Sequence, residues 1–296
     1  MNFSPEKVAN CAVLLAAHEG ERWIEEQIWS ILVQHAVNVH VFISVDPSPD
    51  RTLDLCRGIA ATTTNVTVLP TMLATGSAAA NFFRLIRDVD MNGFDFIALS
   101  DQDDIWHVDK LHQAVSKMTA GGYQAFSSDV MAFWESGKRQ LVKKSYPQTR
   151  IDFLFEAAGP GSTYVLTHGA MTNFRDWLPR DWHGQPPPAH DWLIYAYARA
   201  NRIPWHIDDQ PLLDYRQHPR NALGANMGLA AYLRRARLLC NGWYRAQVAR
   251  VKALVDPDGT IDFSLDRAFL IRNAPSLRRR PRDAGLLALM VLMGLF

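Results

Sequence analysis

Three carboxylates lie within four residues in the sequence Ser100-Asp101-Gln102-Asp103-Asp104, directly after the apolar stretch Phe94–Leu99. Carboxylates at this spacing repel one another unless a cation or hydrogen-bond donors compensate their charge. Mg²⁺ and Mn²⁺ prefer oxygen ligands and commonly complete their coordination with substrate phosphates. The cluster therefore predicts a divalent-cation site. An acidic loop in which Asp104 caps the following helix is the alternative.

A second pair of carboxylates, Asp46 and Asp50, follows the apolar stretch His40–Val45 in a turn-like sequence. Asp50 stands where a helix beginning at Thr52 needs an N-cap, and aspartate is a preferred residue there. Asp46 stands at the tip of the predicted strand, where a carboxylate can accept a hydrogen bond from a nucleotide base. An Asx turn accounts for Asp46 as well.

A further carboxylate opens the helix predicted after the proline-rich stretch 179–188, in the sequence His190-Asp191-Trp192. An aspartate at a helix start is ordinarily an N-cap or a favourable charge near the helix dipole. A carboxylate shielded from solvent can instead act as a general base toward a hydroxyl group. The spacing alone does not choose between these two roles for Asp191.

Basic side chains gather in the sequence Arg216-Gln217-His218-Pro219-Arg220, which follows a short predicted strand. Arginine and histidine on a loop can neutralise a departing pyrophosphate. An ordinary basic surface loop has the same composition, so both interpretations of Arg216 and His218 stay open.

These residues need a scaffold, and the first half of the chain provides alternating apolar strands and amphipathic helices. Strands are predicted at Cys11–Ala17, His40–Val45, Val66–Leu69, Phe94–Leu99 and Gln124–Ser127, and helices at Glu21–Val33, Thr52–Ala60, Ser77–Val89 and Val108–Met118. Such alternation implies a doubly wound α/β sheet, whose ligands bind beyond the carboxyl ends of the strands. No GxGxxG motif follows the first strand and no GxxxxGK(S/T) motif occurs, which disfavours dinucleotide and P-loop binding.

The second half of the chain has a looser pattern. A loop is predicted at Glu135–Lys144, strands at Thr163–Leu166, Ile203–Ile207 and Leu212–Tyr215, a helix from His190 to about Ala200, and largely helical structure at Met227–Leu254. We therefore expect one catalytic domain over residues 1–225 and a helical, basic C-terminal extension over residues 226–296.

Composition excludes several classes of protein. The chain has 296 residues, 48% of them hydrophobic, and a formal net charge of +1. This balance does not fit a disordered chain or a protein that wraps nucleic acid. The three cysteines form no CxxC pair or disulfide framework, and the polar first ten residues do not resemble a signal peptide. A soluble, cytoplasmic protein is expected.

The near-neutral total conceals an asymmetric distribution of charge. Residues 231–296 contain 12 basic and 5 acidic side chains, so an acidic body precedes a basic tail. The segment Arg278–Phe296 joins four arginines to an uncharged stretch of thirteen residues, too short to span a bilayer as a helix. Such a segment can lie at the surface of an anionic membrane. Packing on the body or against a second copy is the alternative.

Taken in order, these segments resemble the inverting nucleotide-sugar glycosyltransferases of family 2, which have the GT-A fold, and most of all the bacterial rhamnosyltransferase-like members. The resemblance covers about Val13 to Gly224, and SDQDDIW together with HDW is its most specific part. The matching stretches are VLLAAHEGERWIEEQIWSIL, ISVDPSPDRTLDL, GSAAANFFRLI, FIALSDQDDIW, GPGSTYVLT, HDWLIYAYA and YRQHPRNALG. The implied fold is a GT-A type doubly wound mixed sheet flanked by helices, with the helical C-terminal extension.

The resemblance also implies roles for the residues of the donor site. Ala17 and Glu19 would contact the nucleoside, and Asp46 would accept a hydrogen bond from the base. Asn81 would belong to the same nucleotide-sugar site. Asp101 and Asp103 match the DxD pair of the family, with Asp103 as the main ligand of Mg²⁺ or Mn²⁺ and Asp101 nearer the ribose or diphosphate.

For the reaction itself, Asp191 matches the catalytic base of the family, which deprotonates the acceptor hydroxyl. Arg216 and His218, together with the metal, would stabilise the leaving diphosphate. The residues expected to support the site are Asp104, Trp106, His190 and Trp192. By resemblance the donor is a nucleoside-diphosphate sugar, with dTDP-rhamnose as the first choice. The acceptor is a glycan or a lipid-linked acceptor in surface polysaccharide synthesis.

The sequence departs from the family in the turn after the second strand, where Val45, Pro47 and Pro49 replace an acidic residue, glycine and threonine. His190 replaces the more familiar glutamate before the base. The QxxRW signature of processive synthases is absent, which favours transfer of one sugar. Two rival functions remain: a sugar nucleotidyltransferase, for which AAHEGER is a poor glycine-rich loop, and a non-catalytic sugar-binding protein with the same fold.

Overall fold

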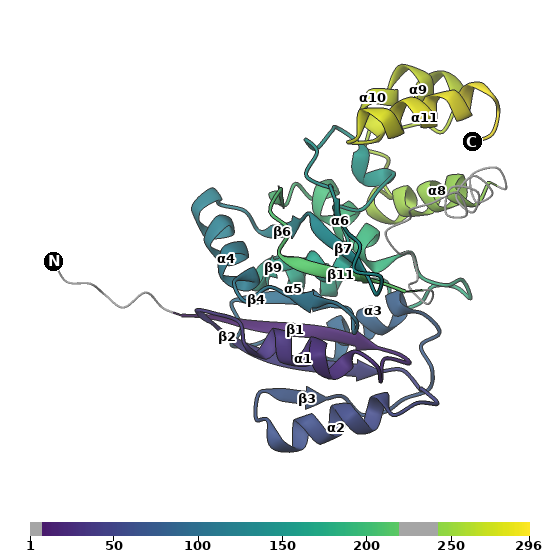
Figure 1. Cartoon of the computed structure of the whole chain (residues 1–296). Helices are drawn as coiled ribbons and strands as arrows, with labels where there is room; N and C mark the ends of the chain where they lie inside the picture. Colours follow the sequence, from purple (N-terminus) through teal and green to yellow (C-terminus); the bar gives the residue numbers. More distant parts are fainter. Residues whose placement is uncertain (1–7, 219–241) are drawn as a thin grey trace.

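A seven-stranded mixed sheet forms the centre of the computed structural model, which describes residues 8–218 and 242–296. The strand order is β10-β6-β9-β4-β1-β2-β3, and β9 runs antiparallel to both of its neighbours (Figure 1). The strands are β1 Ala9–Ala17, β2 Val37–Val45, β3 Val66–Val68, β4 Phe96–Ser100, β6 Ala125–Ser128, β9 Val165–Thr167 and β10 Trp205–Asp208. The predicted mixed sheet is confirmed.

Helices cover both faces of this sheet because its strands carry apolar side chains on both sides. Along β1, Ala12 and Leu14 belong to one core and Cys11, Val13 and Leu15 to the other. The first core is closed by α3, α5 and α6, and the second by α1, α2 and α4. The helices are α1 Ile24–Leu32, α2 Thr52–Thr62, α3 Ala78–Asp88, α4 Lys110–Gly121, α5 His168–Trp177 and α6 His190–Ala200.

A second, four-stranded sheet in the order β5-β11-β7-β8 was not predicted from the sequence. Its strands are β5 Ile105–Trp106, β7 Val130–Trp134, β8 Arg139–Val142 and β11 Leu213–Gln217. The predicted loop at Glu135–Lys144 is wrong in part, because β7 and β8 form a hairpin there, with Gly137 in the turn at φ 80°. The two-residue strand β5 follows the acidic cluster directly, so this small sheet ties residues 101–104 to the end of β11.

The C-terminal part is helical, as predicted, and packs on α6 and on the short helix η1 (Asp152–Leu154) (Figure 1). Its helices are α8 Trp243–Val255, α9 Arg267–Arg272, α10 Ala274–Leu277 and α11 Pro281–Leu292. The boundary expected at residue 225 and much of the predicted helix Met227–Leu254 lie outside the described residues. Within the described residues, no helix is long and apolar enough to cross a membrane.

The basic cluster at the C-terminal end divides into two pairs, which corrects the idea that it faces a lipid surface as a whole. Arg279 is 5% exposed and Arg278 is partly buried, and both form ion pairs with the body. Arg280 and Arg282 are exposed. Two arginines turn inward because carboxylates of η1 and the loop after it lie beneath them.

Candidate active site

The carboxyl ends of β1, β2 and β4 meet at one edge of the sheet. The register pairs Ala17 with Val45 and Leu15 with Ser100, so the residues that follow these strands start side by side. The Asp46 N–H donates to the Ala17 carbonyl over 2.8 Å. The structure therefore brings together three of the segments in which the chemistry was expected.

The loop after β1 is held by Gln102, a residue for which no role was predicted. Its side-chain amide donates to the His18 carbonyl and accepts from the His18 N–H, both over 2.6 Å. Gly20 leaves room for this side chain, because a Cβ there would come within 2.4 Å of the Gln102 Oε1 atom. Glu19 has a positive φ of 48° and donates its N–H to the Ser48 hydroxyl. Gln102 thus joins the first loop to the acidic cluster.

Asp46 and Asn81, both predicted to contact the nucleotide, have different surroundings. Both carboxylate oxygens of Asp46 accept hydrogen bonds from Thr75, one from its N–H and one from its hydroxyl over 2.7 Å. Asn81 is 2% exposed; its amide donates to the carbonyls of Ser44 and Ala17 and accepts from the Ser44 hydroxyl. Asn81 therefore braces β1 and β2 below the edge of the sheet, whereas Asp46 lies at the edge itself.

The acidic cluster is deeply set and poorly compensated. Burial, followed by the charges of Asp103 and Asp191, raises the pKa of Asp101 to about 8. Burial, followed by the charges of Asp103 and Asp101, raises the pKa of Asp104 well above its usual range. Asp104 accepts the Arg216 N–H on one oxygen, and the other oxygen has no partner among the described residues. Asp104 does not cap the next helix, because Asp109 is the N-cap of α4.

The end of β11 brings Arg216 and His218 to this cluster, as the resemblance implied. The His218 Nε2 atom lies 2.8 Å from the Asp103 Oδ2 atom, and its ring stacks on Trp23 with 4.1 Å between centroids. Arg216 donates from Nε to the Asp103 carbonyl and from Nη2 to the Glu26 carboxylate. The Arg216 guanidinium therefore holds α1 to the acidic loop, and His218 lies nearer to the cluster's carboxylates.

Asp191 is the second residue of α6, after the N-cap Ala189, and its side chain caps no helix end. Its Oδ1 atom accepts the N–H of the adjacent Trp192 over 2.7 Å, and its carbonyl accepts from the Tyr164 hydroxyl. Burial raises the pKa of Asp191 to about 6, and the positive charge of Lys144 opposes that shift. Because the charge of Asp191 also raises the pKa of Asp101, the two carboxylates belong to one electrostatic site.

Three of the residues expected to support the site, His190, Trp192 and Trp106, pack against neighbouring elements. His190 stacks on Phe82 with 3.9 Å between ring centroids, and burial lowers its pKa to about 3, so it is neutral. Its Nε2 atom has no hydrogen-bond partner among the described residues and lies where a Cβ on Gly161 would come within 2.2 Å. The indole nitrogen of Trp192 donates to the Phe153 carbonyl, and Trp106 is 3% exposed.

A cleft of about 1050 Å³ opens beside His218, between the loops after β1 and β2 and the β7–β8 hairpin. Trp23, Pro49 and Trp134 supply apolar walls, and Glu19 and Asp50 supply polar ones. An ion pair between Arg22 and Glu135 joins two residues of its lining over 2.7 Å. This volume lies at the upper end of the range for small-molecule sites.

The residues present fit a hard divalent cation only with help from a ligand. Among residues 8–218 and 242–296, no group of three or more His, Cys, Asp or Glu side chains is placed to hold a metal alone. Asp101 and Asp103 offer carboxylate oxygens, and burial together with the neighbouring negative charges raises the pKa of Asp101. Mg²⁺ or Mn²⁺ bound here would take its remaining ligands from water or substrate phosphates.

Comparison with known proteins agrees with this geometry. The family model described as "Glycosyltransferase like family 2" matches residues 9–207. The dTDP-rhamnosyl transferase RfbG of Shigella flexneri is 36% identical over 289 residues, which are 95% of this chain and 100% of the relative.

Solved structures share the fold at low sequence identity. S. aureus TarS 1-349 in complex with UDP-GlcNAc aligns with a TM-score of 0.57 at 13% identity, covering 97% of this chain and 80% of that one. The mannosyltransferase PcManGT from Pyrobaculum calidifontis, in complex with GDP-Man and Mn²⁺, aligns with a TM-score of 0.51 at 15% identity, covering 95% and 84%.

Proposed function

The chain belongs to glycosyltransferase family 2, and from this premise we propose that it transfers one rhamnosyl residue from dTDP-rhamnose, with inversion, to a hydroxyl group of a glycan or lipid-linked acceptor. The near-complete coverage of a dTDP-rhamnosyl transferase at 36% identity supports this choice of donor. A role in the synthesis of surface polysaccharide follows from such a donor and acceptor.

One observation carries the mechanism: Asp191 is a partly buried carboxylate with a pKa of about 6 that shares a site with Asp101. A base with a pKa near the working pH combines a large ionised fraction with useful proton affinity. Asp191 would accept the proton of the acceptor hydroxyl while that oxygen forms a bond to the anomeric carbon. The bond from this carbon to the diphosphate oxygen breaks on the opposite side, which inverts the configuration and releases dTDP.

The opposite side of the site would hold the diphosphate. Asp103 and Asp101 are the residues we assign to Mg²⁺ or Mn²⁺, which when bound would neutralise charge developing on the leaving group. The Mn²⁺ named with the structurally similar mannosyltransferase supports this choice of ion. His218, in contact with Asp103, would supply a further positive or hydrogen-bonding group beside the diphosphate.

The nucleoside would lie along the edge formed by the ends of β1 and β2. Ala17 and Glu19 would contact it, and Asp46 would accept a base N–H. Thr75 occupies one lone pair on each Asp46 oxygen, and each oxygen has another to offer. Asn81 would contribute indirectly, by fixing the strands that carry these residues.

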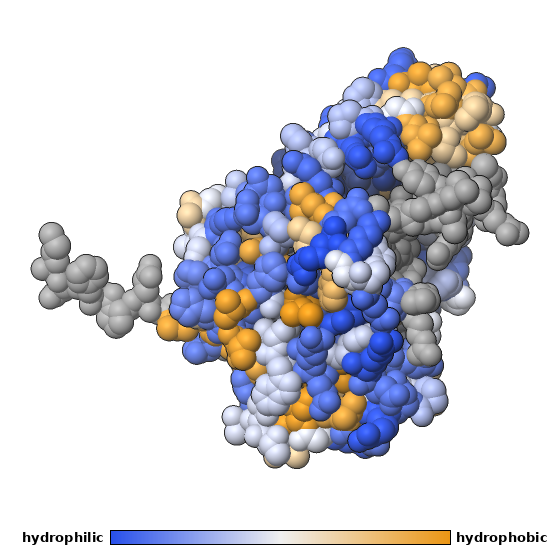
Figure 2. Space-filling model, in the orientation of Figure 1, coloured by the Kyte–Doolittle hydropathy of each residue, from blue (hydrophilic) through white to orange (hydrophobic). Residues whose placement is uncertain are grey.

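We also propose that the protein works in the cytoplasm, at the face of an anionic membrane that presents its acceptor. Helix α11 supports this partner, because Leu286, Leu289 and Met293 form an exposed stripe continuous with the exposed Arg282. Figure 2 shows hydrophobic residues gathered on these C-terminal helices. Apolar side chains beside arginines suit the boundary between lipid headgroups and acyl chains. The catalytic domain would comprise residues 1–225, and the extension residues 226–296.

The proposal is tested by measuring dTDP release and sugar transfer with the purified full-length protein, Mn²⁺ and a lipid-linked glycan acceptor. We expect transfer from dTDP-rhamnose, and at least tenfold less from UDP-GlcNAc or GDP-mannose. Equal transfer from another donor would overturn the rhamnosyl assignment. Pyrophosphate release from dTTP and a sugar 1-phosphate would identify a nucleotidyltransferase. Donor binding without any turnover would indicate a non-catalytic sugar-binding protein.

A further inference from the structure

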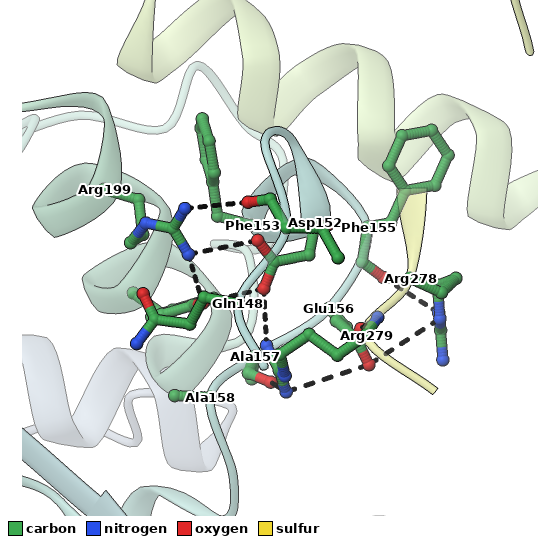
Figure 3. Close-up of polar contacts among 12 residues, drawn as sticks. Gln148, Asp152, Phe153, Phe155, Glu156, Ala157, Ala158, Arg199, Arg278 and Arg279 are labelled. Carbon is green, nitrogen blue, oxygen red and sulfur yellow. Dashed lines mark hydrogen bonds and ion pairs between the residues drawn. The ribbon is translucent and has the colours of Figure 1, made fainter. Parts of the chain in front are cut away.

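Arg279 reaches from the C-terminal segment into the body of the protein and ends on Asp152. Its Nη1 atom donates to the Asp152 Oδ2 atom over 2.8 Å, and both side chains are almost fully buried (Figure 3). Asp152 also accepts from the Tyr195 hydroxyl over 2.7 Å and from Arg199 Nη1 over 3.0 Å. Tyr195 and Arg199 lie one turn apart on α6, whose first turn carries Asp191.

Arg279 also fixes the loop that follows η1. Its Nη2 atom donates to the Ala157 carbonyl over 2.6 Å, and its N–H donates to the Glu156 carboxylate over 2.6 Å (Figure 3). One residue further along, the Ala158 N–H donates to the Tyr164 hydroxyl over 3.0 Å. That hydroxyl in turn donates to the Asp191 carbonyl over 3.1 Å. A continuous set of hydrogen bonds therefore runs from Arg279 to the backbone of Asp191.

The start of the segment 152–158 contacts α6 at two further places, both beyond Asp191 along the helix. In the first turn of α6, the Trp192 indole nitrogen donates to the Phe153 carbonyl, so the residue after Asp191 is held as well. Along the helix, Asp152 holds Tyr195 and Arg199. Removing the Arg279 guanidinium would leave Asp152 and Glu156 buried with less positive charge around them, and buried carboxylates tolerate this poorly. The segment would then shift, and α6 with it.

We propose that Arg279 is a positioning residue for the transfer reaction: through Asp152 and the loop 156–158 it sets the orientation of α6, and thereby the direction of the Asp191 carboxylate. This inference rests on the proposed role of Asp191 as the base. It makes the C-terminal extension part of the support of the active site. It also gives the inward-facing Arg279 a purpose distinct from lipid contact.

Arg278 provides a matched control, since it is an adjacent arginine with buried contacts of the same kind. It donates to the Phe155 carbonyl and the Tyr244 hydroxyl and pairs with Glu156. It has no hydrogen bond to Asp152 or α6 in the described structure. Arg278→Gln should therefore lower thermal stability without changing the direction of Asp191, whereas Arg279→Gln should do both.

The experiment compares kcat, KM for the donor and the melting temperature of the full-length variants. We expect Arg279→Gln to lower kcat by roughly 10- to 100-fold, the effect of a displacement of about 1 Å at a reacting group. The KM for the donor should stay within about twofold of the parent value, because the donor residues lie on other elements. Arg279→Lys keeps the charge and one hydrogen bond, so it should recover at least half of the loss in log kcat. It should also fold if Arg279→Gln does not. Arg278→Gln should leave kcat within about twofold.

A double-variant cycle separates positioning from general destabilisation. In an Asp191→Asn background, Arg279→Gln should have almost no further effect on the residual rate, because the group that it positions is already gone. Additive losses, or a parent-like kcat in both Arg279 variants, would overturn the inference while leaving the proposed function intact. Full activity of Asp191→Asn alone would overturn the proposed function instead.

Discussion

His218 and Asp103, which are separated by 114 intervening residues, contact each other at the centre of the site, with 2.8 Å between Nε2 and Oδ2. The contact exists because β5, which directly follows the acidic cluster, pairs antiparallel with the start of β11, so the later residues of β11 and His218 run back alongside the cluster. The loop after β4 of the seven-stranded sheet and the residue after β11 of the small sheet therefore meet at the Asp103 carboxylate. This arrangement places a basic group beside the residue that we assign to the metal.

Substitution at either end of this contact should weaken activation by metal. Asp103→Asn removes a carboxylate ligand, and His218→Gln removes the group that orients it. The Mn²⁺ concentration for half-maximal transfer should rise roughly 10- to 100-fold in His218→Gln and further in Asp103→Asn. Titration of EDTA-treated protein with Mn²⁺ measures this half-maximal concentration. Asp209→Asn, at an exposed carboxylate, is the control, and an unchanged Mn²⁺ requirement in Asp103→Asn would contradict the assignment.

The pH dependence of transfer should follow the ionisation of Asp191. Burial raises its pKa from 3.8 to about 6, so the carboxylate that accepts a proton is lost as the pH falls through 6. We expect kcat to be level above about pH 7 and to fall about tenfold per unit below pH 6.

Apart from Asp101, the titratable groups around Asp191 leave this prediction unchanged. Tyr164 and Tyr215 stay neutral throughout this range because burial raises their pKa values well above 10. Asp101 shares the site, and in the absence of metal its titration adds to the fall of kcat at low pH. Asp191→Asn should lower kcat at least about 1000-fold and flatten the remaining profile. An acid limb that persists unchanged in Asp191→Asn would assign the titration to another group.

Gly161 should be intolerant of even one added methyl group. A Cβ there would lie 2.2 Å from the His190 Nε2 atom, and His190 cannot retreat because it stacks on Phe82. Gly161→Ala should therefore cost about 1–3 kcal/mol of unfolding free energy and lower transfer. Gly58→Ala is the control, because Gly58 lies in α2 with open space around its Cα. Urea unfolding of both variants checks the difference, and equal stability would contradict the predicted clash.

Gln102 should affect donor binding more than the chemical step. Its amide makes two hydrogen bonds to the backbone of His18, in the loop assigned to the nucleoside. Gln102→Ala frees that loop, so we expect the KM for the donor to rise about 3- to 10-fold with kcat within about twofold. Steady-state kinetics at saturating acceptor measures both constants. A fall in kcat at an unchanged KM would place Gln102 at the reacting centre instead.

Membrane binding should depend on the exposed stripe of α11. Leu289→Glu places a charge among the exposed apolar residues of this helix, where Leu289 is 50% exposed. We expect at least a tenfold loss of sedimentation with vesicles rich in anionic phospholipid. Leu141→Glu, at a leucine of similar exposure on β8, should bind like the parent. Equal binding by both variants would show that α11 does not face the lipid.

Local pattern was enough to predict the sheet and the positions of its loops. The apolar stretches that became β1, β2 and β4 are buried on both faces, and each is followed by polar residues at the same edge. Period and length mark such strands without any knowledge of their partners. The assignment of Asp101 and Asp103 as the DxD pair and of Asp191 as the base came from the resemblance to the family, and these catalytic roles stay predictions.

Tertiary structure alone decided which polar residues meet. The small sheet escaped prediction because β5 has two residues and its partner β11 comes more than 100 residues later, so no local period marks it. Likewise, Arg279 and Arg280 are chemically identical neighbours in the sequence. The first is buried and the second exposed because Asp152 and Glu156, more than 120 residues earlier, lie under only one of them. Whether a charged side chain is buried depends on a partner of opposite charge, and long-range packing determines which residue that partner is.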